Sequence, residues 1–261
     1  MAKLVPIIFF LFLSFSLKAQ TWEFGVGAGG AGYMGDLNPK NPVKVSGYSF
    51  GAFAKRNFNG YLSARLNYTY GKIAAADSNS NNQQFRDRNL SFTTTLSEIS
   101  LIGEFNFMHY IPDAGKNKYS PYLFLGIASV NYSPTTIYNG AKYDLRAAQT
   151  EGEPKPYPTS TLAALYGAGI KYNVAGKFTL GAELGYRNAF TDYLDDVSGV
   201  YVNKGAGQSV SKALADRSGE KTGIYLGIPG TQRGDSRPRD TYFFAQVTFS
   251  YTFVTQKCYF Q

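Results

Sequence analysis

The stretch YLSARLNYTYGK, residues 61–72, decides the fold because its side chains alternate in character at every step. One set is apolar or aromatic and the other is polar or small: Leu62, Ala64, Leu66, Tyr68 and Tyr70 against Ser63, Arg65, Asn67, Thr69 and Gly71. Successive side chains of a β-strand point to opposite faces of the sheet. The stretch therefore predicts a strand with one apolar face and one polar face.

Seven other runs show a similar alternation, and their length indicates the environment. With residues 61–72 included, the runs are 21–32, 47–56, 61–72, 92–108, 119–132, 159–173, 177–187 and 241–254. Most hold ~10–14 residues, whereas the mean strand of soluble proteins holds ~5–6 and a tilted strand crossing a bilayer needs ~9–11. The runs thus favour a transmembrane barrel over a soluble sandwich. The barrel must close, because lipid cannot satisfy an unpaired sheet edge.

The connections between the runs alternate in length. Short connections at 57–60, 109–118 and 174–176 alternate with long polar ones at 33–46, 73–91, 133–158 and 188–240. Outer-membrane barrels have short periplasmic turns, longer outer loops and an even strand number. We expect an all-β, antiparallel, eight-stranded barrel with both termini in the periplasm. Ten strands are the alternative, because residues 200–202 and 224–228 of the last loop are β-prone.

The beginning of the chain predicts export from the cytoplasm. Together with the predicted barrel, it places the protein in the outer membrane of the cell. Residues 1–19 combine a basic start, a short apolar run and a small residue near the end, which is typical of a signal peptide. The apolar run is too short for a membrane helix, which needs ~20 residues. We therefore expect a signal peptide at 1–19, a barrel at 20–254 and a short periplasmic tail at 255–261.

Composition excludes several functional classes. Aromatic residues make up 16% of the chain, which excludes disorder, and a single Cys excludes a disulfide scaffold. His109 is the only histidine and has no catalytic motif around it, so we expect no enzyme. The glycine pattern at 25–30 has dinucleotide-loop spacing but no helix after it. We expect no cofactor, no nucleic acid and no small-molecule substrate, whereas any pairing of Cys258 stays open.

The polar faces of the runs predict a filled barrel interior. They carry three cations and three anions: Arg65, Lys171, Arg187, Glu98, Glu104 and Glu183. An eight-stranded barrel is just wide enough inside for side chains to fill. A buried charge without a partner is costly, so we expect these six to pair and to close the lumen. The aromatic side chains near strand ends are expected to form interfacial girdles: Tyr68, Tyr70, Tyr122, Tyr172, Tyr186 and Tyr242.

Basic residues predominate at the predicted periplasmic end. The expected rim holds Lys55, Arg56, Lys116, Lys118, Lys177 and Lys257 against Glu23 and Asp113. Such a rim suits outer-membrane lipids with anionic headgroups or an acidic periplasmic protein attracted by the same field. Both alternatives stay open at this point.

Two loop motifs remain. The segment TDYLDDVS, residues 191–198, groups Asp192, Tyr193, Asp195 and Asp196. We expect a capped turn or short helix there, with Asp192 near its start, and a Ca²⁺ site is the minor alternative. The tripeptide RGD at 233–235 could suggest adhesion, but a polar loop explains it equally simply.

Several strings together resemble the PorG-like barrels of Bacteroidetes-type bacteria. They are EFGVG at 23–27, GDLNP at 35–39, TDYLDDVS at 191–198, YVN at 201–203, RGD at 233–235, DTYF at 240–243 and KC at 257–258. The resemblance implies a non-enzymatic outer-membrane component of the type IX secretion machinery. It also implies contact with a periplasmic ring of the PorK lipoprotein and PorN, in an accessory or anchoring role.

Two other functions compete with this one. One is a free-standing small barrel with an adhesion or protective role, and the other is a membrane-embedded hydrolase or acyltransferase. In the favoured interpretation, residues 192–196 fold over the outer mouth of the barrel.

Overall fold

The computed structural model describes residues 21–113, 117–204, 209–235 and 237–253. The predicted signal peptide and tail, with residues 20 and 254, lie outside the described residues. Eight antiparallel strands form the barrel: β1 (Thr21–Met34), β2 (Val45–Asn57), β3 (Leu62–Ala76), β4 (Ser91–Asn106), β5 (Tyr119–Tyr138), β7 (Ser160–Ala175), β8 (Phe178–Ala189) and β9 (Thr241–Phe253). Their order is β4-β3-β2-β1-β9-β8-β7-β5, and pairing of β4 with β5 closes the cylinder. The prediction of an eight-stranded barrel is confirmed.

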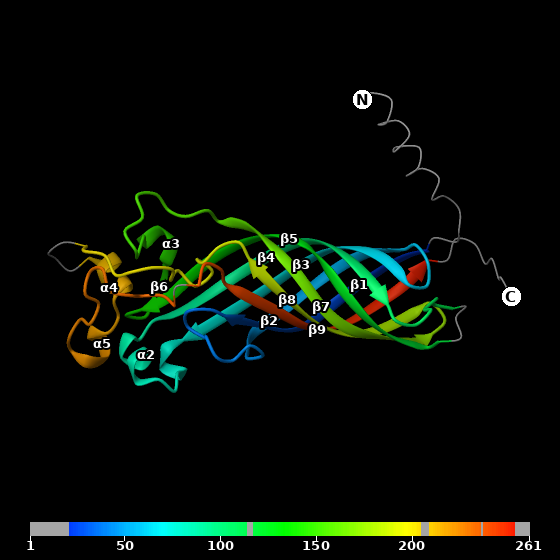
Figure 1. Cartoon of the computed structure of the whole chain (residues 1–261), viewed down its shortest axis with the longest axis horizontal. Coiled ribbons are helices and arrows are strands. Elements are labelled where there is room, and N and C mark those ends of the chain that lie inside the picture. Colours follow the sequence, from blue (N-terminus) through cyan, green and yellow to red (C-terminus); the bar gives the residue numbers. More distant parts are fainter. Residues whose placement is uncertain (1–20, 114–116, 205–208, 236, 254–261) are drawn as a thin grey trace, which may run out of the picture.

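All other elements gather at the end of the barrel that carries the long connections (Figure 1). They are η1 (Asp77–Asn79), α2 (Gln83–Arg88), β6 (Ala141–Asp144), α3 (Leu145–Ala148), α4 (Val210–Ala215) and α5 (Gly219–Thr222). The opposite end has the short connections, and there β1 begins beside the end of β9, with Trp22 opposite Phe253. We call the first end the cap end and the second the turn end.

The strands reach further into the cap than the alternation predicts. β5 contains 20 residues, and its last four pair with β6 as a hairpin. The ten-strand alternative is wrong for the described residues: in the last connection only Val200 and Gln232 form an isolated bridge, and residues 224–228 form no strand. Short β-prone stretches there have no neighbouring strand edge to pair with, since β8 and β9 are already paired with each other.

The outward faces of the strands form an apolar wall. Its most exposed members include Val26, Leu66, Leu125, Ile127 and Val247, which are 55–71% exposed. Soluble monomers rarely expose contiguous apolar patches larger than a few hundred Å². The wall is therefore a lipid-facing surface, and the barrel is a transmembrane one. Among the described residues, no helix is both long and apolar enough to cross a membrane.

The interior divides into two parts along the barrel axis. The section surrounded by the apolar wall is lined with charged and polar side chains, whereas an apolar core fills the cap end. That core includes Tyr33, Phe92, Leu96, Leu194 and Leu214, each at most 3% exposed. Two glycines leave room for rings in the lumen, because a Cβ at Gly71 or Gly185 would lie within 2.9 Å of Phe244 or Phe124 respectively.

Candidate functional site: a plugged lumen and a cross-linked cap

Among the described residues, eight charged side chains fill the lumen, and their charges balance. The lumen network comprises four cations and four anions: Lys55, Arg65, Lys171, Arg187, Glu23, Glu98, Glu104 and Glu183. Each of the eight is at most 9% exposed. Placing opposite charges in contact offsets much of the cost of removing them from water.

Glu104 of β4 is the centre of the lumen network. It lies 2.5 Å from Lys171 Nζ, 3.1 Å from Arg65 Nε and 3.8 Å from Lys55 Nζ. These three cations come from β7, β3 and β2, so a single carboxylate joins strands on several sides of the barrel. Lys55 also lies 2.7 Å from Glu23 Oε1, which extends the network to β1.

Two further carboxylates each combine an arginine with a tyrosine. Glu183 Oε2 lies 2.9 Å from Arg65 Nη1 and accepts a hydrogen bond of 2.7 Å from the Tyr122 hydroxyl. Glu98 Oε2 lies 3.1 Å from Arg187 Nε and accepts a 2.8 Å bond from the Tyr242 hydroxyl. The interior is thus crossed by direct contacts between strands, and all six charges expected in the lumen lie there.

The prediction for Lys55 is wrong. It was expected on the periplasmic rim, but the residue is 2% exposed and its side chain points into the lumen. The register explains this, because β2 places Lys55 between Glu23 of β1 and Arg65 of β3. Glu23 was assigned to the same rim and is likewise inside. For Glu23 the sequence did indicate the inward position, since Trp22 and Phe24 alternate with it and take the outward positions.

Three of the six rim candidates remain at the turn end. Lys118 is exposed, Lys177 is half-buried with its Nζ 5.9 Å from the Tyr251 ring, and Arg56 lies over the Trp22 ring at 5.2 Å. We call these three the turn-end rim. Asp113 is exposed at the same end. Lys116 and Lys257 lie outside the described residues.

The predicted aromatic girdle is wrong for two of its members. Tyr122 and Tyr242 are at most 2% exposed and point into the lumen, where they donate to Glu183 and Glu98. Tyr68 and Tyr172 are exposed on the outer wall as expected. Alternation alone did not distinguish them, because a tyrosine suits either face: its ring is apolar and its hydroxyl forms hydrogen bonds.

Two buried arginines connect the long loops of the cap. Arg88 binds both carboxylate oxygens of Asp77 at 2.7 and 2.8 Å and donates to the backbone oxygens of Asp36 and Arg233. Arg233 donates to Glu151 Oε1 at 2.9 Å and to the backbone oxygen of Asp196 at 2.7 Å. Bidentate, charge-assisted bonds of this kind are geometrically restrictive. The cap is therefore a folded layer.

A cluster of acidic side chains lies beneath these loops. Asp36, Asp195 and Asp240 are buried, with one carboxylate oxygen of each within 4.8 Å of the others. The Tyr33 hydroxyl contacts Asp195, and it is 3.1 Å from Asp240 Oδ1. Burial raises the pKa of Asp195 and Asp240 well above the usual value and that of Asp36 to about 7. We call these three residues the acidic cluster. Their raised pKa values favour the protonated form of the carboxyl groups near neutral pH.

The acidic residues of TDYLDDVS do not assemble into one site. Asp195 joins the acidic cluster and accepts a 2.9 Å bond from the Val197 amide, whereas Asp196 accepts bonds from the Thr150 and Tyr157 hydroxyls at 2.5 and 2.7 Å. Burial raises the pKa of Asp192 and of Asp196 to about 6. The segment is a series of bends without a helix, and the turn is capped by Asp195 rather than Asp192. Tyr193 stacks on the Tyr157 ring at 4.4 Å.

The RGD tripeptide is not displayed as an adhesive motif. Arg233 is 3% exposed and is held by Glu151 and Asp196. A buried guanidinium cannot be presented to a receptor, so the structure favours the polar-loop interpretation.

A model of one protein family matches residues 2–204, and its description is "Domain of unknown function (DUF6089)". A search of the curated proteins finds no match. Among solved structures, the N-terminal β-barrel domain of OprF from Pseudomonas aeruginosa is similar at 14% identity and a TM-score of 0.38, with 90% of this chain and 98% of that chain covered.

Two other solved structures are similar at the same level. Neisserial surface protein A (NspA) has 10% identity and a TM-score of 0.44, and 90% of this chain and 98% of that chain are covered. A major outer membrane protein from Thermus thermophilus has 14% identity and a TM-score of 0.43, and 90% of this chain and all of that chain are covered.

Proposed function

Because the chain belongs to the DUF6089 family, whose description names no activity, we propose a function from its geometry and its sequence resemblance. The protein is a non-enzymatic outer-membrane barrel that anchors or links the periplasmic PorK/PorN-like ring of the type IX secretion machinery. Small outer-membrane barrels combine a lipid-facing apolar band with short periplasmic turns and longer outer loops. This chain has both features, which supports placing the cap end outside the cell and the turn end in the periplasm.

The observation that carries the proposal is the plugged lumen. A secretion pore needs an open path, whereas Glu104 alone is in contact with cations from three strands across this interior. The barrel therefore offers surfaces to other molecules, and it offers no passage. An anchoring role uses such surfaces and needs no transport through the barrel.

The residue inventory also argues against catalysis. His109 lies at the turn end, where its ring packs edge-on against Tyr61 at 5.2 Å. No ion pair among the described residues includes it, and a general base normally needs a group that orients it. The lumen carboxylates are in turn occupied by cations and hydroxyls.

The turn-end rim is the proposed contact with the ring. Arg56, Lys118 and Lys177 contribute three positive charges at the turn end, and Asp113 is the single exposed acid among the described residues of that end. Complementary charge steers association and is weakened by salt. An acidic surface on a ring protein would match this rim.

The test is a pull-down from the native host. The tagged protein is cross-linked in intact cells, extracted in mild detergent and analysed for ring components. The triple variant Arg56→Glu, Lys118→Glu and Lys177→Glu reverses the turn-end rim, and Lys55 is left unchanged because its reversal would disrupt the lumen network. Lys40→Glu, Lys155→Glu and Lys221→Glu, all at exposed cap positions, make a matched control.

We expect recovery of ring components with the parent and the control, and a reduction on the order of tenfold or more with the rim variant. Equal recovery of ring components with the rim variant and the control would support the anchoring role but exclude the turn-end rim as the contact with the ring. Recovery of the barrel alone, under conditions that preserve the ring complex, would overturn the secretion role.

A second candidate, a free-standing barrel with an adhesion role, is favoured by one observation. Ile224, Tyr225, Leu226 and Ile228 are 50–67% exposed in the connection that follows α5 at the cap end. Exposed apolar groups of this density mark interaction surfaces. Loss of surface binding in an Ile224→Ser, Leu226→Ser variant with intact secretion would favour this candidate.

A further inference from the structure

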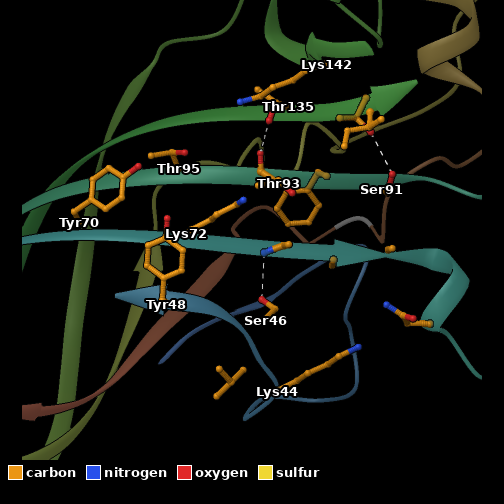
Figure 2. Close-up of a pocket in the computed structure, with 18 residues that line it drawn as sticks. Lys44, Ser46, Tyr48, Tyr70, Lys72, Ser91, Thr93, Thr95, Thr135 and Lys142 are labelled. Atoms are coloured by element: carbon orange, nitrogen blue, oxygen red, sulfur yellow. Dashed lines mark hydrogen bonds between the residues drawn. The ribbon is translucent and has the colours of Figure 1, made fainter. Parts of the chain in front are cut away.

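A hollow of about 630 Å³ lies on the outer side of the barrel wall, where β2, β3, β4 and β5 enter the cap. Lys44, Lys72 and Lys142 line it, and no acidic side chain does. Figure 2 shows Lys72 in the middle of the group, with Lys44 and Lys142 at opposite edges of the view. We call this hollow the lysine pocket.

The three lysines are uncompensated among the described residues. None of the ion pairs of the described residues includes them, in contrast to the lumen cations. Of the acids nearest in sequence, Asp77 is neutralised by Arg88, and Asp144, which caps α3 through the Ala147 amide, forms no ion pair with Lys142 among the described residues. The pocket therefore has a positive field available for an anion.

Hydroxyl groups line the pocket beside the lysines, together with apolar residues that include Val45 and Ile137. Thr93 and Thr95 of β4, Thr135 of β5 and Ser46 lie around Lys72 (Figure 2). Ser46 Oγ accepts from the Ala74 amide at 3.2 Å, and Thr135 donates to the Thr93 backbone oxygen at 3.0 Å, so both hydroxyls are held in place. Hydroxyls both donate and accept, which suits phosphate oxygens and sugar hydroxyls alike.

The position of the lysine pocket along the barrel axis, next to the apolar wall, indicates that its ligand belongs to the membrane surface. Tyr48 and Tyr70 line it on the side of the apolar wall, and both pack against Phe50, with ring centroids 6.3 and 5.1 Å apart. Tyrosines of this kind sit at the boundary between hydrocarbon and water. Towards the cap, the next outward-facing residues are Lys72 on β3 and Thr95 and Thr93 on β4. An anion bound here is at the level of lipid headgroups.

We propose that the lysine pocket binds the phosphate of a phosphorylated glycolipid of the lipid A type in the outer leaflet. Lysines act as point charges for phosphate, the hydroxyls face the sugar, and the acyl chains lie along Phe50 and the apolar wall below. A hollow of this size fits the range of ~300–1,000 Å³ that holds small ligands. This inference rests on the proposed location, because the cap end faces that leaflet only if it lies outside the cell.

The test uses the full mature barrel in detergent and native mass spectrometry of bound lipid. The probes are bisphosphorylated lipid A, its dephosphorylated form and phosphatidylglycerol. The variant Lys44→Gln, Lys72→Gln, Lys142→Gln removes the three charges, and Lys40→Gln, Lys155→Gln, Lys221→Gln makes the same change of net charge at exposed positions that do not line the pocket. Far-UV circular dichroism checks that both variants remain barrels.

We expect the parent and the control to retain bisphosphorylated lipid A, and the pocket variant to bind it on the order of 100-fold more weakly. Equal retention by the pocket variant, or by the parent with dephosphorylated lipid, would overturn the phosphate site. Stronger retention of phosphatidylglycerol would overturn the glycolipid assignment. These outcomes do not depend on ring proteins, so a failure here is distinct from a failure of the anchoring role, which the pull-down measures.

Discussion

The lumen and the cap both bury many polar groups, but they satisfy them in opposite ways. In the lumen network every anion lies against at least one cation, and Glu104 alone contacts three of them, Arg65, Lys55 and Lys171. In the acidic cluster of the cap, Asp36, Asp195 and Asp240 face one another with Tyr33. The lumen offsets its buried charges with opposite charges, whereas the excess acid of the cap depends on bound protons.

The largest expected effect comes from breaking the balance in the lumen. Glu104→Gln keeps the shape of the side chain and leaves three buried cations without their shared charge. We expect the free energy of unfolding in detergent, measured by urea titration, to fall by about 3 kcal/mol or more. Glu220→Gln is the matched control, since Glu220 is one-third exposed in its pair with Arg217 and should cost less than ~1 kcal/mol. Similar losses for both variants would contradict the shared-anion role of Glu104.

The next effect concerns the cross-links of the cap. Arg233→Met removes bonds to Glu151 and to the backbone of Asp196 and Ala215. We expect limited proteolysis in connections 139–159 and 190–240 to accelerate by a factor on the order of 100, with global unfolding of the barrel unchanged. Arg237→Met is the control, because among the described residues Arg237 pairs only with Asp235, and that pair is partly exposed. A loss of barrel stability equal to that of Glu104→Gln would erase the distinction between the two regions.

The pH response should differ between the two regions. Burial raises the pKa of Asp36 to about 7 from an unfolded value near 3.8, and it raises those of Asp195 and Asp240 in the same direction. The folded cap therefore binds more protons than the unfolded loops, and its stability falls as the pH rises from about 4 through about 7. We expect hydrogen exchange at the Leu194 and Val197 amides to accelerate at least about tenfold between pH 5 and pH 8, after correction for intrinsic rates.

A matched pair of variants sharpens this expectation. Asp36→Asn removes one ionisable member of the acidic cluster and should flatten the pH response. Asp113→Asn, at an exposed position of the turn end, should leave it unchanged. A response that persists unchanged in Asp36→Asn would assign the pH dependence to groups other than Asp36.

The smallest expected effect is on ion conduction. Because the lumen network fills the interior, the parent protein in a planar bilayer should show no steady conductance above background. Regular current steps, abolished by boiling the sample, would show that the lumen pairs open and would contradict the anchoring proposal.

Much of the fold was predictable from the alternation in runs such as 61–72 and from the lengths of the connections. Both depend on local geometry, since a strand alternates faces and a bilayer sets the strand length. The charges on clear polar faces, such as Arg65 and Glu183, were placed correctly inside. Lys55 was not, because the alternation in β2 is interrupted by small residues and only the register with β1 and β3 shows which way it points.

The cap was much less predictable. Asp195 and Asp196 are adjacent, yet one faces Tyr33 and Asp240 and the other faces Thr150, Tyr157 and Arg233. Irregular loops have no period that relates sequence position to direction. Their hydrogen bonds join residues more than 30 positions apart, so spacing in the sequence carries no information about them.

The sequence by itself determined that the chain is an eight-stranded transmembrane barrel with long connections at one end. Strand periodicity, strand length and the need to satisfy every backbone group in lipid act locally along the chain, and together they permit few other solutions. Only the tertiary structure decided that Glu104 is shared by three cations, that Asp36, Asp195 and Asp240 meet, and that Lys44, Lys72 and Lys142 line one pocket. These contacts depend on the register around a closed barrel and on loop packing, which bring together residues that are far apart in the chain.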